Sequence, residues 1–376
     1  MALFIRLPRC HTHMRLTLLF GIGLLLGAAG SVDAQIYSNE FLGVGAGARA
    51  QAMGNSVIAS SKDIYASYWN PAGLAAIDSE RGLVVGAMHA EQFAGVTKYD
   101  FLSVSLPLAD GSKRLALSLI RQGTDDVPNT INLYTPEGIA NYDNITTFGV
   151  ADYAILLSYA QPTRLLSGKL SVGGNLKVIR RIIGDFSNSW GVGIDLGARY
   201  NSGPFTAGIT LRDATSTYNA WKTDLDDRTR EVLITTGNTL PDRSGSETTR
   251  PSILPGVSYR FEFGNIGVAP EVAAWFTFDG QRNTLLSSDP VSADLNVGLE
   301  ADFKQRVFLR LGADQWQRYR ALGEDDERLQ VRPALGLGLR LKSASLDYAF
   351  SNPGNDDNLY AHVVSLQLAL TRPEVD

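Results

Sequence analysis

Residues 331–341 read VRPALGLGLRL, and this stretch decides the fold class. Every second residue from Val331 to Leu341 is apolar, whereas Arg332, Gly336 and Arg340 occupy positions between them. Side chains that alternate in this way point to opposite faces of a β-strand. The stretch is therefore predicted to be a strand with one apolar face and one face of glycine and charge.

The same two-residue period recurs along most of the chain, for example over 192–200, 295–303 and 364–370, and a helical period is almost absent after residue 80. The alternation gives an even number of candidate strands, fourteen in all: 82–90, 98–108, 113–121, 151–161, 169–180, 189–200, 204–212, 252–263, 265–278, 294–303, 306–314, 330–342, 344–350 and 361–370.

The strands of a soluble sandwich also alternate, so the lengths of the connections are needed to distinguish a barrel from a sandwich. Short connections fall at 109–112, 201–203, 264, 304–305 and 343. Between them lie long polar ones at about 122–150, 213–251, 279–293, 315–329 and 351–360. Short turns on one side and long loops on the other are typical of an outer-membrane barrel. The prediction is an all-β fold: an antiparallel transmembrane β-barrel of about fourteen strands, spanning 81–370, with a tail at 371–376.

The N-terminus reads as a leader. Arg6, Arg9 and Arg15 precede the apolar stretch 16–29, and Val32-Asp33-Ala34 fits a small-x-small cleavage site. The alternative is an N-terminal membrane anchor, for which the apolar stretch is short. We expect a cleaved signal peptide over 1–34. No run of 18 apolar residues follows it, which excludes helical membrane spans and favours a bacterial outer-membrane location.

Composition excludes several classes of function. The 34 basic and 39 acidic residues give a formal charge of −5 with no basic block, so nucleic acid is not an expected partner. The one cysteine, Cys10, lies in the leader, so the mature chain has no disulfide, thiolate metal site or cysteine nucleophile.

Catalytic and metal-binding patterns are also missing. Outside the leader only His89 and His362 remain, on separate predicted strands, so neither an enzyme, a metal site nor a cofactor is expected; a lipid-modifying enzyme would have to use one of these two. Acidic clusters at 224–227, 324–327 and 356–357 fall in predicted loops. They are interpreted as solvated charge, with calcium binding left open.

A segment without clean alternation, residues 35–80, separates the leader from the first strand. Asn70-Pro71-Ala72-Gly73 predicts a turn, because Pro71 fixes φ and restricts Asn70 while Gly73 permits positive φ. Asp63 is a candidate cap for a short turn. We expect this compact segment to lie in the lumen as a hatch. Glycines on the polar strand faces would make room for it, or would serve strand curvature alone.

The polar faces also carry charge. Six residues are predicted to face the lumen and to pair across it, or alternatively to select a passing solute: Glu300, Asp302, Arg310, Arg332, Arg340 and Lys342.

Three N-terminal motifs carry a family resemblance: GARAQAMG at 47–54, a Ser-Lys-Asp segment at 61–63 and YASYWNPAGLA at 65–75. Together they resemble the N-terminal signature of the PorV/PorQ family, within the FadL-like group of outer-membrane barrels. DYAF at 347–350 and HVVSL at 362–366 resemble its closing hairpin more loosely. The resemblance implies a fourteen-stranded barrel with a hatch containing Arg49, Met53, Gly54, Asp63, Trp69, Asn70, Pro71 and Gly73.

Two functions follow from the resemblance. The first is an interaction or shuttle component of type IX-like protein secretion, with a translocon and cargo C-terminal signal domains as partners and loops 122–150 and 213–251 as contact surfaces. The alternative is a FadL-like transporter of hydrophobic small molecules. Both functions imply that the barrel lies in the outer membrane, in contact with its lipid.

Overall fold

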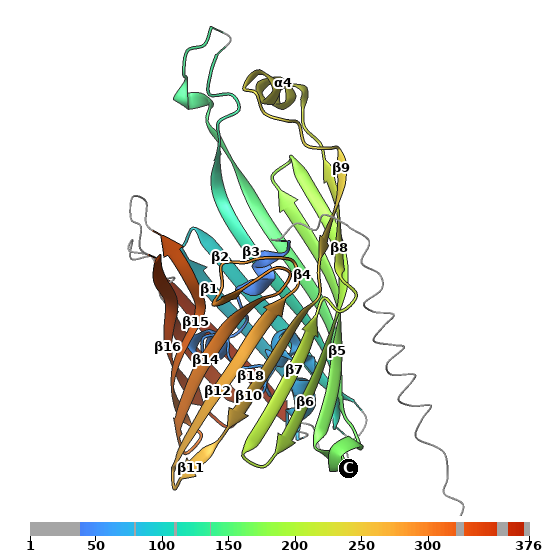
Figure 1. Ribbon diagram of the computed structural model, residues 1–376, viewed down its shortest axis with the longest axis vertical. Coiled ribbons are helices and arrows are strands. Elements are labelled where there is room, and N and C mark those ends of the chain that lie inside the picture. Colours follow the sequence, from blue (N-terminus) through green and yellow to red (C-terminus); the bar gives the residue numbers. More distant parts are fainter. Residues whose placement is uncertain are drawn as a thin grey trace, which may run out of the picture. The chain divides into compact units, whose positions relative to one another are not determined.

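A computed structural model describes residues 38–78, 80–108, 111–135, 137–320, 327–351 and 360–371. These residues form a closed antiparallel β-barrel around a short N-terminal hatch, residues 38–78 (Figure 1). The predicted signal peptide, the end of the predicted tail and the acidic cluster 356–357 lie outside the described residues. No helix in the described ranges is both long enough and apolar enough to cross a membrane.

Eighteen strand segments build the fourteen strands of the barrel wall. In chain order the segments are β1 (Arg81–Gln92), β2 (Thr97–Leu108), β3 (Lys113–Asn129), β4 (Thr146–Pro162), β5 (Leu170–Ile183), β6 (Ser187–Ser202), β7 (Phe205–Arg212), β8 (Thr217–Thr223), β9 (Ser244–Thr249), β10 (Ser252–Tyr259), β11 (Phe261–Phe263), β12 (Ile266–Thr277), β13 (Leu286–Ser287), β14 (Ser292–Phe303), β15 (Val307–Arg320), β16 (Glu327–Arg340), β17 (Ala344–Ser351) and β18 (Ala361–Thr371).

The wall closes where its first and last strands meet. β1 pairs antiparallel with β18, with Val84 opposite Ala369 and Glu91 opposite His362. Closure leaves the sheet without a free edge, so backbone N–H and C=O groups find partners that lipid cannot supply. The predicted fourteen-stranded barrel is confirmed.

The two faces of each strand differ as the alternation predicts. Leu337 on β16 is 55% exposed and its neighbours Leu335 and Leu339 are also exposed, whereas Arg310 on β15 is 1% exposed. Leucines project outward from most strands, as an interface with lipid requires. Two stacked sheets in water would bury these leucines, so the sandwich alternative is wrong.

The long connections lie at one end of the barrel, as predicted, but that end also has two short ones. The long-loop end carries connections 130–145, 224–243 and 278–291, and the β3–β4 hairpin and helix α4 (Asp227–Thr235) project there (Figure 1). Two further connections at this end, 93–96 and 184–186, are tight turns. Gly95 and Gly184 adopt positive φ in them, which glycine tolerates without strain. The length of a loop therefore does not by itself assign its end.

One wall strand is broken. β6 pairs with β7 up to Leu196–Leu211, and with β8 from Val192–Tyr218. Between β7 and β8 the chain turns at 213–216, where Asp213 and Ser216 adopt positive φ. The ladder between neighbouring strands is interrupted at this point, inside what the sequence predicts to be a long loop.

The hatch is built from short helical pieces: η1 (Glu40–Gly43), α2 (Ala48–Ala52), α3 (Ala66–Trp69) and η2 (Pro71–Ala76). Asn70 is extended and its side chain caps η2 by accepting the Ala72 N–H at 3.2 Å. Asp63 accepts the Tyr65 N–H at 3.0 Å, so it caps a short turn. Gly73 does not need positive φ; a Cβ there would lie 2.3 Å from the Ser61 carbonyl oxygen. Its role is close approach, which corrects the predicted turn chemistry.

Candidate functional site

A buried ionic network joins the hatch to the wall. Glu300 on β14 accepts hydrogen bonds from Arg49 of the hatch at 2.8 Å and from Arg310 on β15 at 2.7 Å. Arg310 also donates to Asp347 on β17 at 2.7 Å. A charge removed from water is stable only when opposite charges and hydrogen bonds surround it, so this network holds the hatch against three wall strands.

Wall side chains also satisfy the hatch backbone. The N–H groups of Ala48, Ala59 and Ile64 donate to side chains of the wall at 3.0, 2.8 and 2.9 Å. The acceptors are the Ser365 hydroxyl, the Glu271 carboxylate and the Gln367 amide oxygen, respectively. Short helices leave many N–H groups without intrahelical partners, and here polar residues of the lumen supply the acceptors.

The hatch residues that the resemblance predicts make contacts within the hatch or with the barrel wall. Trp69 donates to the Ala46 carbonyl at 2.7 Å, and the Asn70 amide donates to the carbonyls of Ile58 at 3.0 Å and Ala198 at 3.1 Å. Pro71 lies against Gly173 on β5. Met53 packs against Gly298 on β14, and Gly54 against the backbone of β15.

Glycines of the lumen face give the hatch its space. A Cβ on Gly312 would lie 2.0 Å from the Gly54 nitrogen, closer than real carbon atoms approach. The same holds for other wall glycines whose Cβ would meet the hatch: Gly173, Gly197, Gly208, Gly298 and Gly336. Close approach of a second backbone, rather than strand curvature alone, accounts for these glycines.

Replacing Gly312 with valine is expected to push the hatch away from β15 and to lower the stability of the barrel by about 1–3 kcal/mol, because the site has no spare volume. The measurement is the urea midpoint of the refolded barrel, together with protease cleavage in the hatch. The matched control is Gly245→Val on β9, since no heavy atom lies within 4 Å of a Cβ there. Equal losses in the two variants would contradict the packing role.

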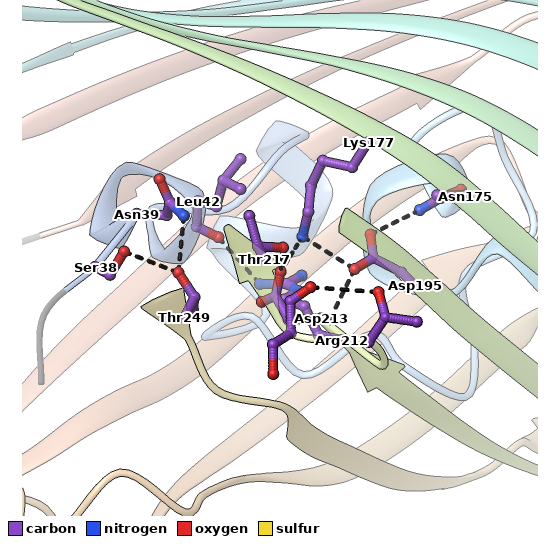
Figure 2. A network of polar contacts seen from close by, with 12 residues as sticks. Ser38, Asn39, Leu42, Asn175, Lys177, Asp195, Arg212, Asp213, Thr217 and Thr249 are labelled. Atoms are coloured by element: carbon purple, nitrogen blue, oxygen red, sulfur yellow. Dashed lines mark hydrogen bonds and ion pairs between the residues drawn. The ribbon is translucent and has the colours of Figure 1, made fainter. Parts of the chain in front are cut away.

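A second buried ionic cluster lies at the break in the wall (Figure 2). Lys177 on β5 is 1% exposed and donates to Asp195 on β6 at 3.0 Å and to Asp213 at 2.5 Å. Thr217 donates its hydroxyl to Asp213, and Asp195 accepts the Asp213 N–H at 2.9 Å. Contacts of Asp213 with Lys177, Asp195 and Thr217 therefore fix the turn 213–216.

Arg212 connects this break to the hatch. It donates to the Leu42 carbonyl at 3.0 Å (Figure 2). It also donates to the Tyr68 carbonyl at 3.3 Å. Its guanidinium also lies 4.8 Å from the ring centres of Tyr68 and Trp275, a cation–π distance. Arg212 therefore links the end of β7, next to the turn 213–216, to the hatch.

A cavity of about 420 Å³ lies above the hatch at the long-loop end. The hatch forms its floor through Glu40, Gly43, Val44 and Asn55. Trp275 and Phe93 add aromatic surface. The remaining lining residues are almost all polar: Gln92, Gln122, Thr277, Arg282, Asn283, Thr284, Asp294, Asn296, Asp314, Gln315, Gln317, Arg332, Ser351 and Ala361.

Both arginines of the cavity are engaged by acids. Arg332 donates to Asp314 at 2.7 and 2.5 Å. Arg282 pairs with Asp279 at 2.5 Å and with Glu40 at 3.0 Å. Burial by itself would lower the pKa of Arg282, but the hydrogen bond to Asp279 and the charge of Glu40 outweigh it, so the pKa is raised and the group stays charged.

Five of the six charged residues that were predicted to face the lumen have contacts inside the barrel. Glu300, Arg310 and Arg332 lie inside with the partners given above. Asp302 pairs with Arg260 at 2.8 Å, and Arg340 lies 4.7 Å from the Phe308 ring centre. The prediction for Lys342 is wrong: β16 ends at Arg340, and Lys342 is an exposed residue in the turn that follows.

Sequence reasoning missed the cluster around Lys177 and two of the three acids of the cavity, Asp294 and Asp314. The position of Asp195 on the polar face of a predicted strand was the one sequence feature that could have indicated the cluster around Lys177. His89 and His362 both point outward and are hydrogen-bonded, to Asp100 at 2.7 Å and to Tyr348 at 2.8 Å. Neither histidine lines the cavity above the hatch.

The acidic cluster 224–227 has a local structural role. Asp226 is the N-cap of α4 and accepts the Thr229 N–H at 2.7 Å, which lowers the pKa of Asp226. Most of the cluster 324–327 lies outside the described residues.

No protein-family model and no curated protein matches the chain. Solved structures do. The CymD monoaromatic hydrocarbon channel matches with a TM-score of 0.54 and 14% identity, over 88% of this chain and 98% of the channel. The toluene transporter TbuX of Ralstonia pickettii matches with a TM-score of 0.52 and 12% identity, over 87% of this chain and 98% of TbuX.

The toluene transporter TodX of Pseudomonas putida matches with a TM-score of 0.51 and 12% identity, over 86% of this chain and 96% of TodX. At these identities the matches show the fold. Membership of the FadL-like group and membership of the PorV/PorQ family both stay predictions.

Proposed function

We propose that the chain is an outer-membrane transporter of hydrophobic small molecules, gated by its hatch. The observation that carries this function is the cavity of about 420 Å³ whose floor is the hatch. Its volume is in the range of small-molecule sites, and it faces the long-loop end, which is the outer side in barrels of this kind. A solute entering there meets the hatch first.

Two further features support a transport path. The wall is interrupted at 213–216, next to the Arg212 contacts with the hatch. Such a break is a place where an apolar molecule could leave or enter the lumen without crossing an intact ladder. In addition, solved structures with the same fold are named as channels or transporters of monoaromatic hydrocarbons and toluene.

A disulfide across the hatch tests gating directly. A Cβ on Gly86 of β1 would lie 3.4 Å from the Ile64 Cβ of the hatch, close to disulfide geometry. Ile64→Cys combined with Gly86→Cys should therefore lock the hatch when oxidised. We expect oxidised cells to take up N-phenyl-1-naphthylamine, a hydrophobic dye, no faster than cells without the barrel, and reduction to restore uptake.

The two single-cysteine variants are the matched controls, and oxidation should leave their uptake unchanged. The one cysteine of the sequence, Cys10, lies in the predicted leader, so residues 38–371 contain none that could interfere. Undiminished dye uptake through the fully oxidised double variant would contradict hatch gating. Equal uptake by cells with and without the unmodified barrel would contradict transport itself.

The second candidate is a role in protein secretion, as the PorV/PorQ resemblance implies. Its favouring observation is the pair of projections at the long-loop end, the β3–β4 hairpin and α4 (Figure 1). The hairpin exposes Tyr134, Ile139 and Tyr142, which are suitable contacts for a partner protein. Deleting the gene should then abolish export of cargo with matching C-terminal signals, and unchanged export would contradict this role.

A further inference from the structure

Some residues that line the cavity above the hatch carry buried polar atoms that lack hydrogen-bond partners. Within the described part of the chain, five lining residues each have one such atom: Asn55 Oδ1, Gln122 Oε1, Trp275 Nε1, Thr277 Oγ1 and Asp294 Oδ1. A buried polar atom without a partner typically costs about 1–3 kcal/mol. Such atoms are rare in folded proteins, and several around one cavity show that its lining has unused hydrogen-bonding capacity, which a small side-chain movement would open to a ligand.

These five atoms converge from separate parts of the fold. Asn55 belongs to the hatch and Gln122 to β3, while Trp275 and Thr277 lie on β12 and Asp294 on β14. Side-chain amides are the commonest polar group in the lining, and each offers both donors and an acceptor. The cavity contains seven of them: Asn55, Gln92, Gln122, Asn283, Asn296, Gln315 and Gln317. Three of the amides have protein partners: Asn55 donates to Asp314, Asn296 donates to the Asn55 carbonyl, and Asn283 accepts the Arg318 N–H. A pure hydrocarbon would displace water from the remaining amides without replacing its hydrogen bonds.

The charge of the cavity favours one kind of polar group. Its lining contains three acids, Glu40, Asp294 and Asp314, against two arginines. Both arginines are held by acids at 3.0 Å or less. Asp294 is a residue of the lining, and it has no ion pair within 4 Å among the described residues. A cationic or hydroxyl group would therefore be attracted, and a carboxylate repelled.

We propose that this cavity binds amphipathic solutes in which a ring-sized apolar body carries an amine or a hydroxyl group. The body lies against Trp275, Phe93 and Val44, and the polar group lies at Asp294 and the neighbouring amides. This solute class rests on the proposed transport function, which it narrows from hydrophobic molecules in general to those that bring a hydrogen-bond donor. Sites built to hydrogen-bond a solute discriminate strongly against analogues that lack the group.

Four ligands with the same ring test the class: toluene, benzyl alcohol, benzylamine and benzoate. Binding to the purified full-length mature barrel in detergent is measured by calorimetry at pH 7, where benzylamine is protonated. We expect benzylamine to bind most tightly, benzyl alcohol next, and toluene and benzoate more weakly. Asp294→Asn should weaken benzylamine binding roughly tenfold, because a charge-assisted hydrogen bond is lost, and should leave toluene unchanged.

Asp143→Asn is the matched control, because it removes the same charge from an exposed loop residue. It should not change any of the four affinities. Equal affinities across the series, or toluene as the tightest ligand, would overturn the proposal, as would equal behaviour of the two variants. Heat-modifiable gel mobility reports whether Asp294→Asn folds. If it does not fold, the order of the four affinities in the unmodified protein still supports or overturns the proposed class.

The outcomes separate solute class from transport. Benzylamine binding that depends on Asp294, in a barrel that fails the dye-uptake test, keeps the cavity as a binding site and removes the transport function. Normal dye uptake with no preference among the four ligands keeps transport and removes the proposed solute class.

Discussion

Replacing Glu300 with alanine is expected to lower the stability of the barrel by about 3–5 kcal/mol, the usual cost of leaving buried charge without its partner. Arg49 and Arg310 both lose their nearest carboxylate, at 2.8 and 2.7 Å. Arg310 keeps Asp347, and Arg49 keeps the Ser60 hydroxyl at 2.9 Å. Urea unfolding of the barrel in lipid vesicles measures the loss, and protease cleavage in the hatch shows whether the hatch is released first.

The control for Glu300 is Glu262→Ala. Glu262 pairs with Arg260 at 3.2 Å, but its side chain is 67% exposed, so water screens the pair. Arg260 also keeps Asp302 at 2.8 Å after the change. We expect a loss of less than about 1 kcal/mol in this variant. A Glu300→Ala barrel no less stable than Glu262→Ala would show that the hatch network contributes little.

The wall of the barrel could be predicted because lipid imposes a rule on every strand. Leu335, Leu337 and Leu339 had to share one face, and the glycines and arginines between them the other, since adjacent side chains of a strand point in opposite directions. The rule stops where the strand stops. Lys342 has the parity of a lumen residue, but β16 ends two residues earlier, at Arg340, and the turn frees Lys342 from the alternation.

The break between β7 and β8 could not be predicted, because no local residue type requires it. Asp213 and Ser216 adopt positive φ without being glycines. What holds them there is Lys177, which lies 36 residues away in the sequence from Asp213. Residues 217–223 and 244–249 therefore form wall segments where the sequence predicts loop.

The cavity could not be predicted from the sequence either, but for a different reason. Its polar lining comes from the hatch, from several wall strands and from loop 278–291, and closure of the barrel alone brings these parts together. Asn55 and Asp314, for instance, share a hydrogen bond of 2.9 Å across 259 residues. Sequence alternation tells which side chains face the lumen, but it does not tell at what height in the barrel they meet.

Replacing Lys177 with methionine is expected to have the second large effect, again about 3–5 kcal/mol, because Asp195 and Asp213 would then be buried without this cation. Methionine keeps much of the length and the apolar stem of lysine, so packing changes little. Urea unfolding in vesicles measures the global loss. Hydrogen exchange at the amides of 213–217 reports the local one, and these amides should lose protection. Lys169→Met is the control, since Lys169 is exposed and donates to Ser202 at 3.0 Å.

Neutralising the two acids distinguishes lost charge pairing from lost packing. Adding Asp195→Asn and Asp213→Asn to Lys177→Met removes the unpaired charges while keeping side chains of nearly equal shape. We expect this triple variant to recover a substantial part of the stability, because an uncharged buried cluster costs less than a charged one without its cation. If the triple variant is no more stable than Lys177→Met alone, charge does not explain the cluster, and the turn at 213–216 must be held by its shape and hydrogen bonds instead.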